Sequence, residues 1–331
     1  MSSLEVHAPD GVGEVHVDAD LVALALSVLD LRDGDVLLVT SKVVAKAEGR
    51  QREQARDDAV AEETVRVVAR RGPTRIVRTR HGLTLAAAGV DASNVTAGSV
   101  VLLPLDPDAS ARRLREGVRA ACGANVAVVV TDTAGRAWRD GQTDIAVGAA
   151  GLRVLDDHAG RVDSYGNELA VTAPAVADEI AGAAELAQGK LGARPFARLR
   201  GRADLVLAVG DDGPGAAGVL RAPARDMFGF GAREAVVAAL AAGVEESELR
   251  DGFGAPSSPA DLADALATVL AAPVLIDAEG ARELDGAPVV QVVVHLDDPA
   301  LHVTALDALA RAFRWTWHAS GAEVRFSPDV P

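Results

Sequence analysis

Hydrophobic and polar positions along the chain form short apolar runs separated by polar or glycine-rich stretches. Runs rich in Val and Leu predict strands over residues 35–40, 99–105, 125–133 and 203–210. The run "VVV" at 128–130 ends on Thr-Asp-Thr. We expect the strand to stop there and to present polar side chains in a loop. Shorter strands are predicted at 74–80 and 82–90.

Three other segments have apolar residues near helical spacing. A helix is predicted within 51–72, closed by Gly72 and Pro73. Another is predicted over 106–123, with Asp or Ser as candidate caps at its start and glycine at its end. A third covers 172–192, with Thr172 as a possible N-cap and a proline in its first turn. Strands and helices do not alternate strictly, which predicts an α+β fold with a mixed sheet rather than a doubly wound one.

The chain changes character near residue 250. The stretch 251–259, "DGFGAPSSP", is typical of a linker, and the ~80 residues after it are enough for a small α+β unit. We therefore predict two domains: a larger one over 1–250 and a small C-terminal α+β appendage over 251–331.

Composition and charge exclude several classes of function. Hydrophobic residues make up 49% of the chain, but aromatics only 3%, so the core must consist mainly of Val, Leu and Ala. The net charge of −15 argues against binding nucleic acid or an anionic membrane. Cys122 is the only cysteine, which excludes an intrachain disulfide and a cysteine-based zinc site. No signal peptide and no apolar run of the ~20 residues that span a bilayer are visible, so we expect a cytoplasmic protein.

Two aspartates follow apolar segments and lie beside small hydroxyl residues: Asp91 in "GVDASN" and Asp132 in "VTDTAGR". Carboxylates in such a setting suit a hard divalent cation. The alternative is that both are turn residues that accept hydrogen bonds from nearby backbone N–H groups. Lys42 and Lys46 lie where another apolar run breaks, and cations near metal-binding carboxylates are what a polyphosphate site needs. A plain surface role is the alternative for these lysines.

The glycine-rich loop 213–218, "GPGAAG", matches the dinucleotide pattern G-x-G-x-x-G. Its context does not fit, because Pro214 lies inside the loop and no continuous helix follows it. A P-loop motif is absent from the sequence. The loop begins with Asp211 and Asp212, which suits a metal or a metal-bound phosphate better, and a flexible surface loop is the alternative.

Several segments together resemble one family. "SKVVAKAEGR", "AAGVDASNV", "LLPLDPDASARRLR", "TDTAGRAWRDGQTDIAVGAAGL" and "VDSYGNELAVTAPAVADEIAGAAEL" occur in order and at suitable distances. They are similar to the coenzyme F-420:L-glutamate ligase family, over roughly residues 12–245. The resemblance implies a mixed-sheet, two-lobed α+β ligase domain that works as an intertwined homodimer. It also implies a GTP-dependent reaction in which L-glutamate is joined to the phospholactyl carboxylate of the deazaflavin coenzyme precursor and further γ-linked glutamates are added.

The resemblance implies roles for individual residues and cofactors. Divalent cations, Mn²⁺ or Mg²⁺, and K⁺ would be required. The implied metal ligands are Asp91, Asp132 and, in the loop after 203–210, Asp212. The implied nucleotide contacts are Ser41, Lys42, Lys46, Asn94 and Thr133. Lys46 would also stabilise the charge that develops on the phosphates.

Other functions remain open at this stage. A related ligase could act on a different carboxylate, and a catalytically silent homologue could keep the fold and bind the cofactor. The sequence names no general base. The ~80 residues after 250 are too few for a flavin-binding reductase domain, so we expect no second redox activity.

Overall fold

The computed structural model describes residues 3–93, 96, 98–241, 245–284 and 287–329. The chain divides into two compact units. Unit 1 comprises Met1–Val65 and Ile76–Leu220, and unit 2 comprises Arg66–Arg75 and Arg221–Pro331. The predicted domains, 1–250 and 251–331, differ from these units and stay a prediction.

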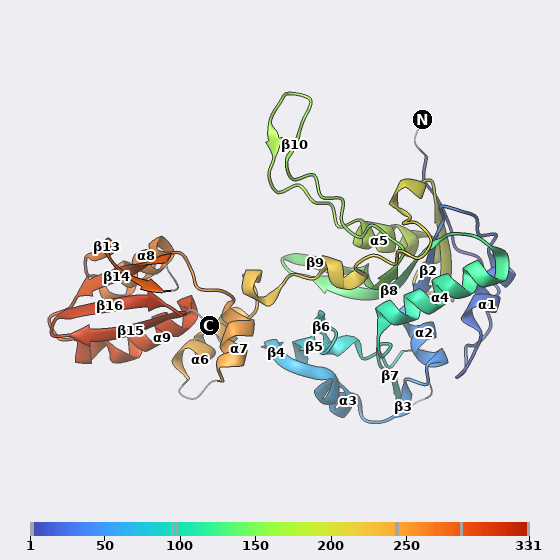
Figure 1. Cartoon of the computed structure of the whole chain (residues 1–331). Coiled ribbons are helices and arrows are strands. Elements are labelled where there is room, and N and C mark those ends of the chain that lie inside the picture. The colour runs from blue at the N-terminus through green and yellow to red at the C-terminus, as the bar shows by residue number, and fades with distance from the viewer. Residues whose placement is uncertain (1–2, 94–95, 97, 242–244, 285–286, 330–331) are drawn as a thin grey trace. The chain divides into compact units, whose positions relative to one another are not determined.

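Unit 1 is built on a five-stranded mixed sheet (Figure 1). Its strand order is β1 (Glu5–His7), β12 (Phe196–Arg200), β2 (Val36–Thr40), β8 (Ala127–Arg136) and β9 (Arg139–Ala150). β2 and β8 run parallel, and all other neighbours are antiparallel. The predicted α+β class with a mixed sheet is confirmed.

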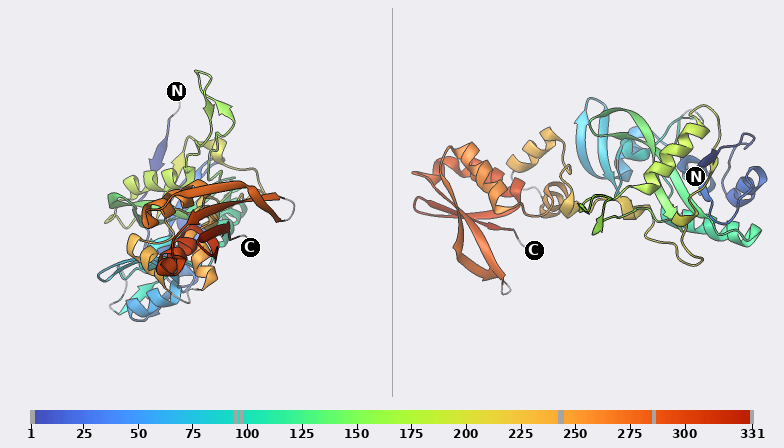
Figure 2. Two further views of the ribbon diagram at one scale, coloured as in Figure 1. Left: turned by 90° about the vertical axis from the view of Figure 1, so that its left-hand side faces the viewer. Right: turned by 90° about the horizontal axis from the view of Figure 1, so that it is seen from above.

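The sheet is buried on both faces, which explains why its central strands are nearly continuous apolar runs. Leu37, Val128 and Val130 pack on one face with helices α1 (Leu21–Val28) and α4 (Pro107–Cys122). On the other face, residues such as Leu38 and Val129 pack with helix α5 (Val176–Gln188) (Figure 2). The two cores thus hold the sheet between two layers of helix.

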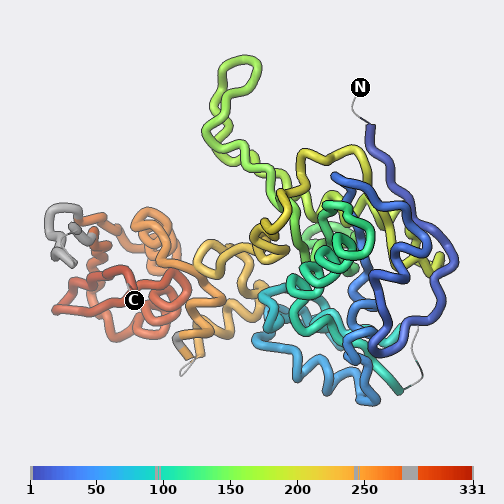
Figure 3. The backbone as a smooth tube through the Cα atoms, turned by 45° about the vertical axis from the view of Figure 1, so that its right-hand side comes forward, coloured from blue at the N-terminus to red at the C-terminus, as the bar shows by residue number. Residues whose placement is uncertain are grey.

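The remaining elements up to residue 220 are short. They are α2 (Ser41–Ala47), β3 (Gln51–Glu53), α3 (Arg56–Glu63), β4 (Thr64–Arg71), β5 (Thr74–Thr79), β6 (Thr84–Ala86), η1 (Ala87–Gly89), β7 (Ser99–Val101), β10 (Arg161–Val162), β11 (Glu168–Leu169), η2 (Ala203–Leu205) and η3 (Ala216–Val219). β3 pairs with β7, and β4, β5 and β6 form a three-stranded sheet. The β10–β11 pair lies in a long excursion between β9 and α5 that projects from the sheet (Figure 3).

In unit 2, two helices pack on a four-stranded antiparallel sheet of order β13-β14-β16-β15. Trp315 is buried in its core and Trp317 packs against it, as expected for core residues. The unit's elements are η4 (Pro223–Arg225), α6 (Ala232–Leu240), α7 (Glu246–Phe253), α8 (Pro259–Leu270), β13 (Val274–Leu284), β14 (Ala287–His295), η5 (Pro299–His302), α9 (Val303–Phe313), β15 (Trp315–Ser320) and β16 (Glu323–Pro328). None of the helices in the described part of the chain is long and apolar enough to cross a membrane.

Several element predictions were wrong in part, including the strands at 99–105 and 82–90, which are confined to β7 and β6. The helix predicted within 51–72 is confined to α3, and β4 takes over at Thr64 because a run of β-branched residues favours a strand. The strand predicted at 203–210 is replaced by the short helix η2, with only a single bridge at Val206. Helix α5 begins at Val176, later than the expected cap at Thr172. The strand of 128–130 continues to Arg136, because β9 pairs with it along that length.

Candidate functional site

The candidate site forms where β2 and β8 end side by side. The two strands are parallel and Thr40 pairs with Thr131, so the next residues of each chain segment meet. Ser41, buried at the start of α2, donates a hydrogen bond from Oγ to Oδ1 of Asp132 at 3.2 Å. Asp132 therefore lies within a strand, not in the expected loop, and is oriented by the first residue of a helix.

Asp91 is brought to the same helix by an ion pair. Its Oδ2 lies 2.6 Å from Nζ of Lys42, which also contacts Oγ of Ser93 at 2.9 Å. Ser93 in turn donates its backbone N–H to Oδ1 of Asp91 at 2.7 Å. Burial alone would raise the pKa of Asp91, but the hydrogen bonds from Lys42 and Ser93 outweigh it and lower the pKa. Asp91 is thus held ionised beside the lysine.

Asp132 has the opposite electrostatic setting. Burial, together with the negative charges of Asp144 and Asp91, raises its pKa to about 6, against hydrogen bonds from Thr133 and Ser41 that lower it. The repulsion shows that these three carboxylates lie close enough to interact. A bound cation would relieve it.

Sequence reasoning missed Asp144 and Lys190. Asp144 is buried and pairs with Thr133 across the β8–β9 hairpin, where Thr133 Oγ1 donates to Asp144 Oδ1 at 2.8 Å. Lys190, just after α5, donates to Thr133 Oγ1. Residues 142–147, Gln-Thr-Asp-Ile-Ala-Val, show no strand alternation, and Asp144 is brought near Thr133 only because β8 extends past Thr133 and pairs with β9.

Lys46 is buried in the last turn of α2 and forms an ion pair with the exposed Glu14, Nζ to Oε1 at 2.5 Å. The hydrogen bond and charge of Lys46 lower the pKa of Glu14. Glu14 belongs to the N-terminal stretch, so this contact ties residues before α1 to the lysine-bearing helix. The short helix α2 carries all three predicted nucleotide contacts of this segment: Ser41, Lys42 and Lys46.

Comparison with known proteins is consistent with this site. A family model described as F420-0:Gamma-glutamyl ligase matches residues 55–201. The chain is 40% identical over 209 residues to the coenzyme F420:L-glutamate ligase of Archaeoglobus fulgidus, a match covering 57% of this chain and 84% of that protein. It is 38% identical over 231 residues to the protein of the same name from Methanopyrus kandleri, covering 63% and 91%. The chain belongs to the F420-0:gamma-glutamyl ligase family. It is therefore an enzyme of the ligase class, and the resemblance inferred from its motifs is confirmed.

The third predicted metal ligand of this ligase lies elsewhere. Oδ1 of Asp212 contacts Arg115 Nη1 at 2.7 Å, and the same guanidinium donates from Nε to the carbonyl of Val126. Val126 immediately precedes β8 and lies six residues from Asp132, roughly 20 Å along the strand at ~3.3 Å per residue, so the Arg115–Asp212 pair is at the opposite end of β8. The structure brings Asp91 and Asp132 together but not Asp212. Asn94 lies outside the described residues.

The donors present in the ligase site fit a hard cation. Asp91 and Asp132 supply carboxylate oxygens and Ser41 supplies a hydroxyl, which Mg²⁺ and Mn²⁺ prefer over nitrogen or sulfur. Thr133 and Asp144 form the next pair of the hairpin and point to the opposite face of the sheet. Burial is the main cause of the raised pKa of Asp132, and the charges of Asp144 and Asp91 add to it. Among the described residues, no group of three or more His, Cys, Asp or Glu side chains is placed to hold a metal ion.

Proposed function

We propose that this protein is a GTP-dependent coenzyme F-420:L-glutamate ligase. It would form an amide between L-glutamate and the phospholactyl carboxylate of the coenzyme precursor, and then add γ-linked glutamates. The names of its relatives support the substrates. The observation that carries the proposal is the meeting of Asp132 and Asp91 with Ser41 and Lys42 at the ends of β2 and β8.

The nucleotide would lie along α2. Lys42 and Lys46 supply positive charge for the phosphates, and the hydroxyls of Ser41 and Thr133 supply hydrogen bonds. Lys46 is buried and already desolvated, so its charge acts more strongly on a bound phosphate than that of a surface lysine. Asn94 is proposed as a further nucleotide contact.

Asp91 and Asp132 would hold the divalent cation, Mn²⁺ or Mg²⁺, with Asp144 close by. When bound, the cation neutralises phosphate charge as it moves between oxygens in the transition state. K⁺ is proposed as a second requirement, on family resemblance alone. The predicted role of Asp212 as a ligand stays a prediction, and its contact with Arg115 does not favour it.

The reaction needs the carboxylate to be activated, because it is a poor electrophile. A carboxylate oxygen of the precursor attacks the γ-phosphorus of GTP, the bond to the β-phosphate oxygen breaks, and GDP leaves with that electron pair. The amine of glutamate then attacks the acyl phosphate, expels inorganic phosphate and loses one proton as the amide forms. Lys42 and Lys46 hold the phosphates in place throughout.

We place this activity in residues 1–250 and propose that the protein acts as a homodimer, as the family resemblance implies. The appendage 251–331 has no role in the proposed chemistry, and we propose no redox activity for it.

The test is a ligation assay with purified full-length protein, glutamate-free precursor, L-glutamate, GTP and Mn²⁺, read by mass spectrometry. We expect the precursor to gain one or more glutamyl units and GDP to appear in equal amount for each unit. An Asp132→Asn variant should lose activity about a hundredfold or more. Hydrolysis of GTP with an unchanged precursor would refute the proposed acceptor.

A further inference from the structure

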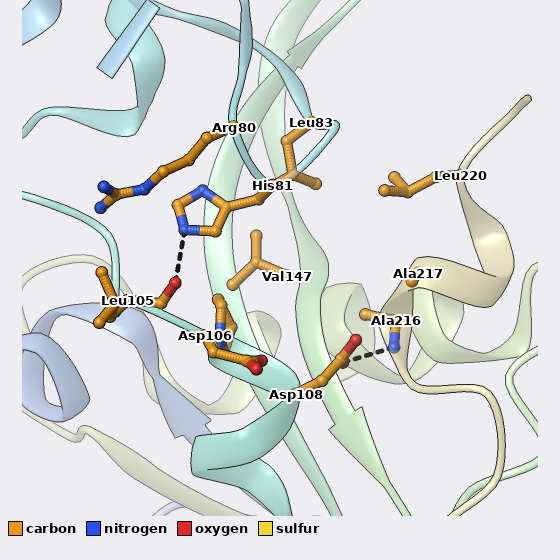
Figure 4. Close-up of a pocket in the computed structure, with 11 residues that line it drawn as sticks. Arg80, His81, Leu83, Leu105, Asp106, Asp108, Val147, Ala216, Ala217 and Leu220 are labelled. Atoms are coloured by element: carbon orange, nitrogen blue, oxygen red, sulfur yellow. Dashed lines mark hydrogen bonds between the residues drawn. The ribbon is translucent and has the colours of Figure 1, made fainter. Parts of the chain in front are cut away.

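A pocket of about 260 Å³ lies in unit 1, outside the contacts described so far (Figure 4). Its walls come from the turn after β5, from the start of α4 and from η3, and Val147 of β9 lies between them. Residues of three segments singled out in the sequence line it, but the proposed nucleotide site does not use it.

One wall residue of the pocket, Val147, lies near Asp132 on the same face of the sheet. Ile145 pairs with Asp132 across the β8–β9 hairpin, and Val147 is two residues further along β9, roughly 7 Å away. Ile145 and Val147 pack into the same core, so they point to the same side. Helix α2 follows β2, which borders β8 on the side away from β9. Asp132 therefore stands between the lysine-bearing helix and the pocket.

Two glycines allow the walls to approach so closely. A Cβ atom on Gly148 would lie 2.4 Å from the carbonyl oxygen of Pro107, and one on Gly215 would lie 2.4 Å from the carboxylate of Asp108. Asp108 is fixed between the walls, because its Oδ1 accepts from the backbone N–H of Ala149 at 2.8 Å and of Ala216 at 2.7 Å. The pocket is thus held by main-chain contacts and is preformed.

The two ends of the pocket carry opposite charge. Asp106 and Asp108 bring negative charge to the pocket and Arg80 brings positive charge (Figure 4). His81 lies between Arg80 and Asp106, with Nε2 3.2 Å from the carbonyl oxygen of Leu105. Arg80 contacts Glu63 at 3.1 Å, but Glu63 is also bound by the buried Arg50.

The Arg80 end keeps an excess of positive charge, because two guanidinium groups share one carboxylate. Burial and the charge of Arg80 both lower the pKa of His81, which shows that this positive charge is felt at the pocket wall. Leu83, Val147 and Leu220 form an apolar stretch between the charged ends.

We propose that this pocket is the subsite for the amino-acid substrate, L-glutamate, of the proposed ligase. The ammonium group lies at Asp106 and Asp108, the methylenes pass over Val147 and Leu83, and a carboxylate faces Arg80. The volume suits one free amino acid, whereas a deazaflavin precursor needs a site of several hundred Å³ or more. Because the pocket lies near Asp132, glutamate bound in it would be close to the carboxylate of the precursor that is activated at the metal site.

The inference rests on the proposed function, so its test measures binding and ligation separately. L-Glutamate is titrated calorimetrically into the full-length protein that holds Mn²⁺ and a non-hydrolysable GTP analogue. We expect the double variant Asp106→Asn, Asp108→Asn to weaken glutamate binding by about tenfold or more, since it removes charge-assisted hydrogen bonds to the ammonium. Asparagine can keep the helix cap at 106 and the Oδ1 contacts at 108. Arg80→Gln should weaken binding similarly.

Asp178→Asn is the matched control. Asp178 also accepts from a backbone N–H of β9, that of Ala146 at 3.0 Å, but it belongs to α5 on the opposite face. Glutamate binding should be unchanged in this variant, and melting temperatures should show that all variants are folded. The inference is overturned if the wild type does not bind glutamate, or if the pocket variants bind it as tightly as the wild type.

Ligation assays on the same samples separate the two hypotheses. Glutamate binding that depends on the pocket, without ligation of the precursor, would refute the proposed function and leave the pocket supported. Normal ligation with an unchanged KM for glutamate in the pocket variants would leave the function intact and overturn the subsite.

Discussion

Replacing Arg115 by methionine should destabilise unit 1 strongly while testing the place of Asp212. Arg115 lies on α4 and is only 5% exposed. Its guanidinium makes six hydrogen bonds, and methionine would fill much of the side-chain volume but make none of them. The acceptors are Asn125 Oδ1, Asp212 Oδ1 and the carbonyl oxygens of Val126, Leu207, Ala208 and Asp211.

The size of the effect follows from these contacts. Four carbonyl oxygens lose a donor in a network that is buried at Val126 and partly buried elsewhere, and a partly buried aspartate loses its cation. Breaking such a buried network costs about 3–5 kcal/mol in the free energy of unfolding. At roughly 2–4 °C per kcal/mol for a domain of this size, the melting temperature should fall by about 6–20 °C. Asp212→Asn keeps the hydrogen bond, loses only a charge that is one-third exposed, and should cost about 1 kcal/mol or less.

Urea unfolding followed by circular dichroism measures both variants, and the ligation assay is run on Asp212→Asn. A loss below about 1 kcal/mol in Arg115→Met would refute the reasoning about the network. The position of Asp212 makes a separate, functional prediction: Asp212→Asn should retain activity within about threefold of the wild type, whereas removing a metal ligand costs about a hundredfold. A loss of that size, with Mn²⁺ affinity reduced, would restore Asp212 as a ligand.

Three further variants test other contacts. Lys46→Met should raise the KM for GTP by about tenfold or more, because a buried cation facing the phosphates is lost, and steady-state kinetics with varied GTP would show it. Gly148→Ala should cost about 1–3 kcal/mol in urea unfolding, because its Cβ would press on the carbonyl of Pro107, whereas Gly135→Ala, with open space around it, should cost less than about 1 kcal/mol. Burial raises the pKa of Asp178, so the native state binds a proton at this carboxyl more tightly than the unfolded state does. The stability gained from that proton is present at low pH and is lost as the pH rises through the raised pKa. The unfolding free energy of the wild type relative to Asp178→Asn should therefore increase as the pH falls from 7 to 4.

Local signals predicted some elements of this fold well. Helix α4 begins after the N-cap Asp106 and ends at Gly123 in a left-handed conformation, as the sequence indicates. Both features act through the backbone next to them and need no distant partner. The segment 51–72 was harder, because its apolar residues fit a helical period while its β-branched residues favour a strand, and sheet pairing with β5 decided the second half.

The site shows the same division between local and distant causes. Asp91, Asp132 and the lysines of α2 were named from segments that resemble a family, and parallel pairing of β2 with β8 brings them together. Asp144 could not be found in this way, because its partnership with Thr133 exists only across a hairpin that was expected to be a loop.

Asp212 illustrates why a strand-end carboxylate is ambiguous. From sequence, Asp132 and Asp212 each follow an apolar run and precede small residues, so the same physical argument applies to both. What separates them is the charge that tertiary structure places opposite each one. Asp212 meets the guanidinium of Arg115, which already satisfies its charge, whereas Asp132 meets other carboxylates and has a raised pKa. Asp212 is held by a buried arginine at the far end of β8, whereas Asp132 is buried among other carboxylates and would gain more from a bound cation.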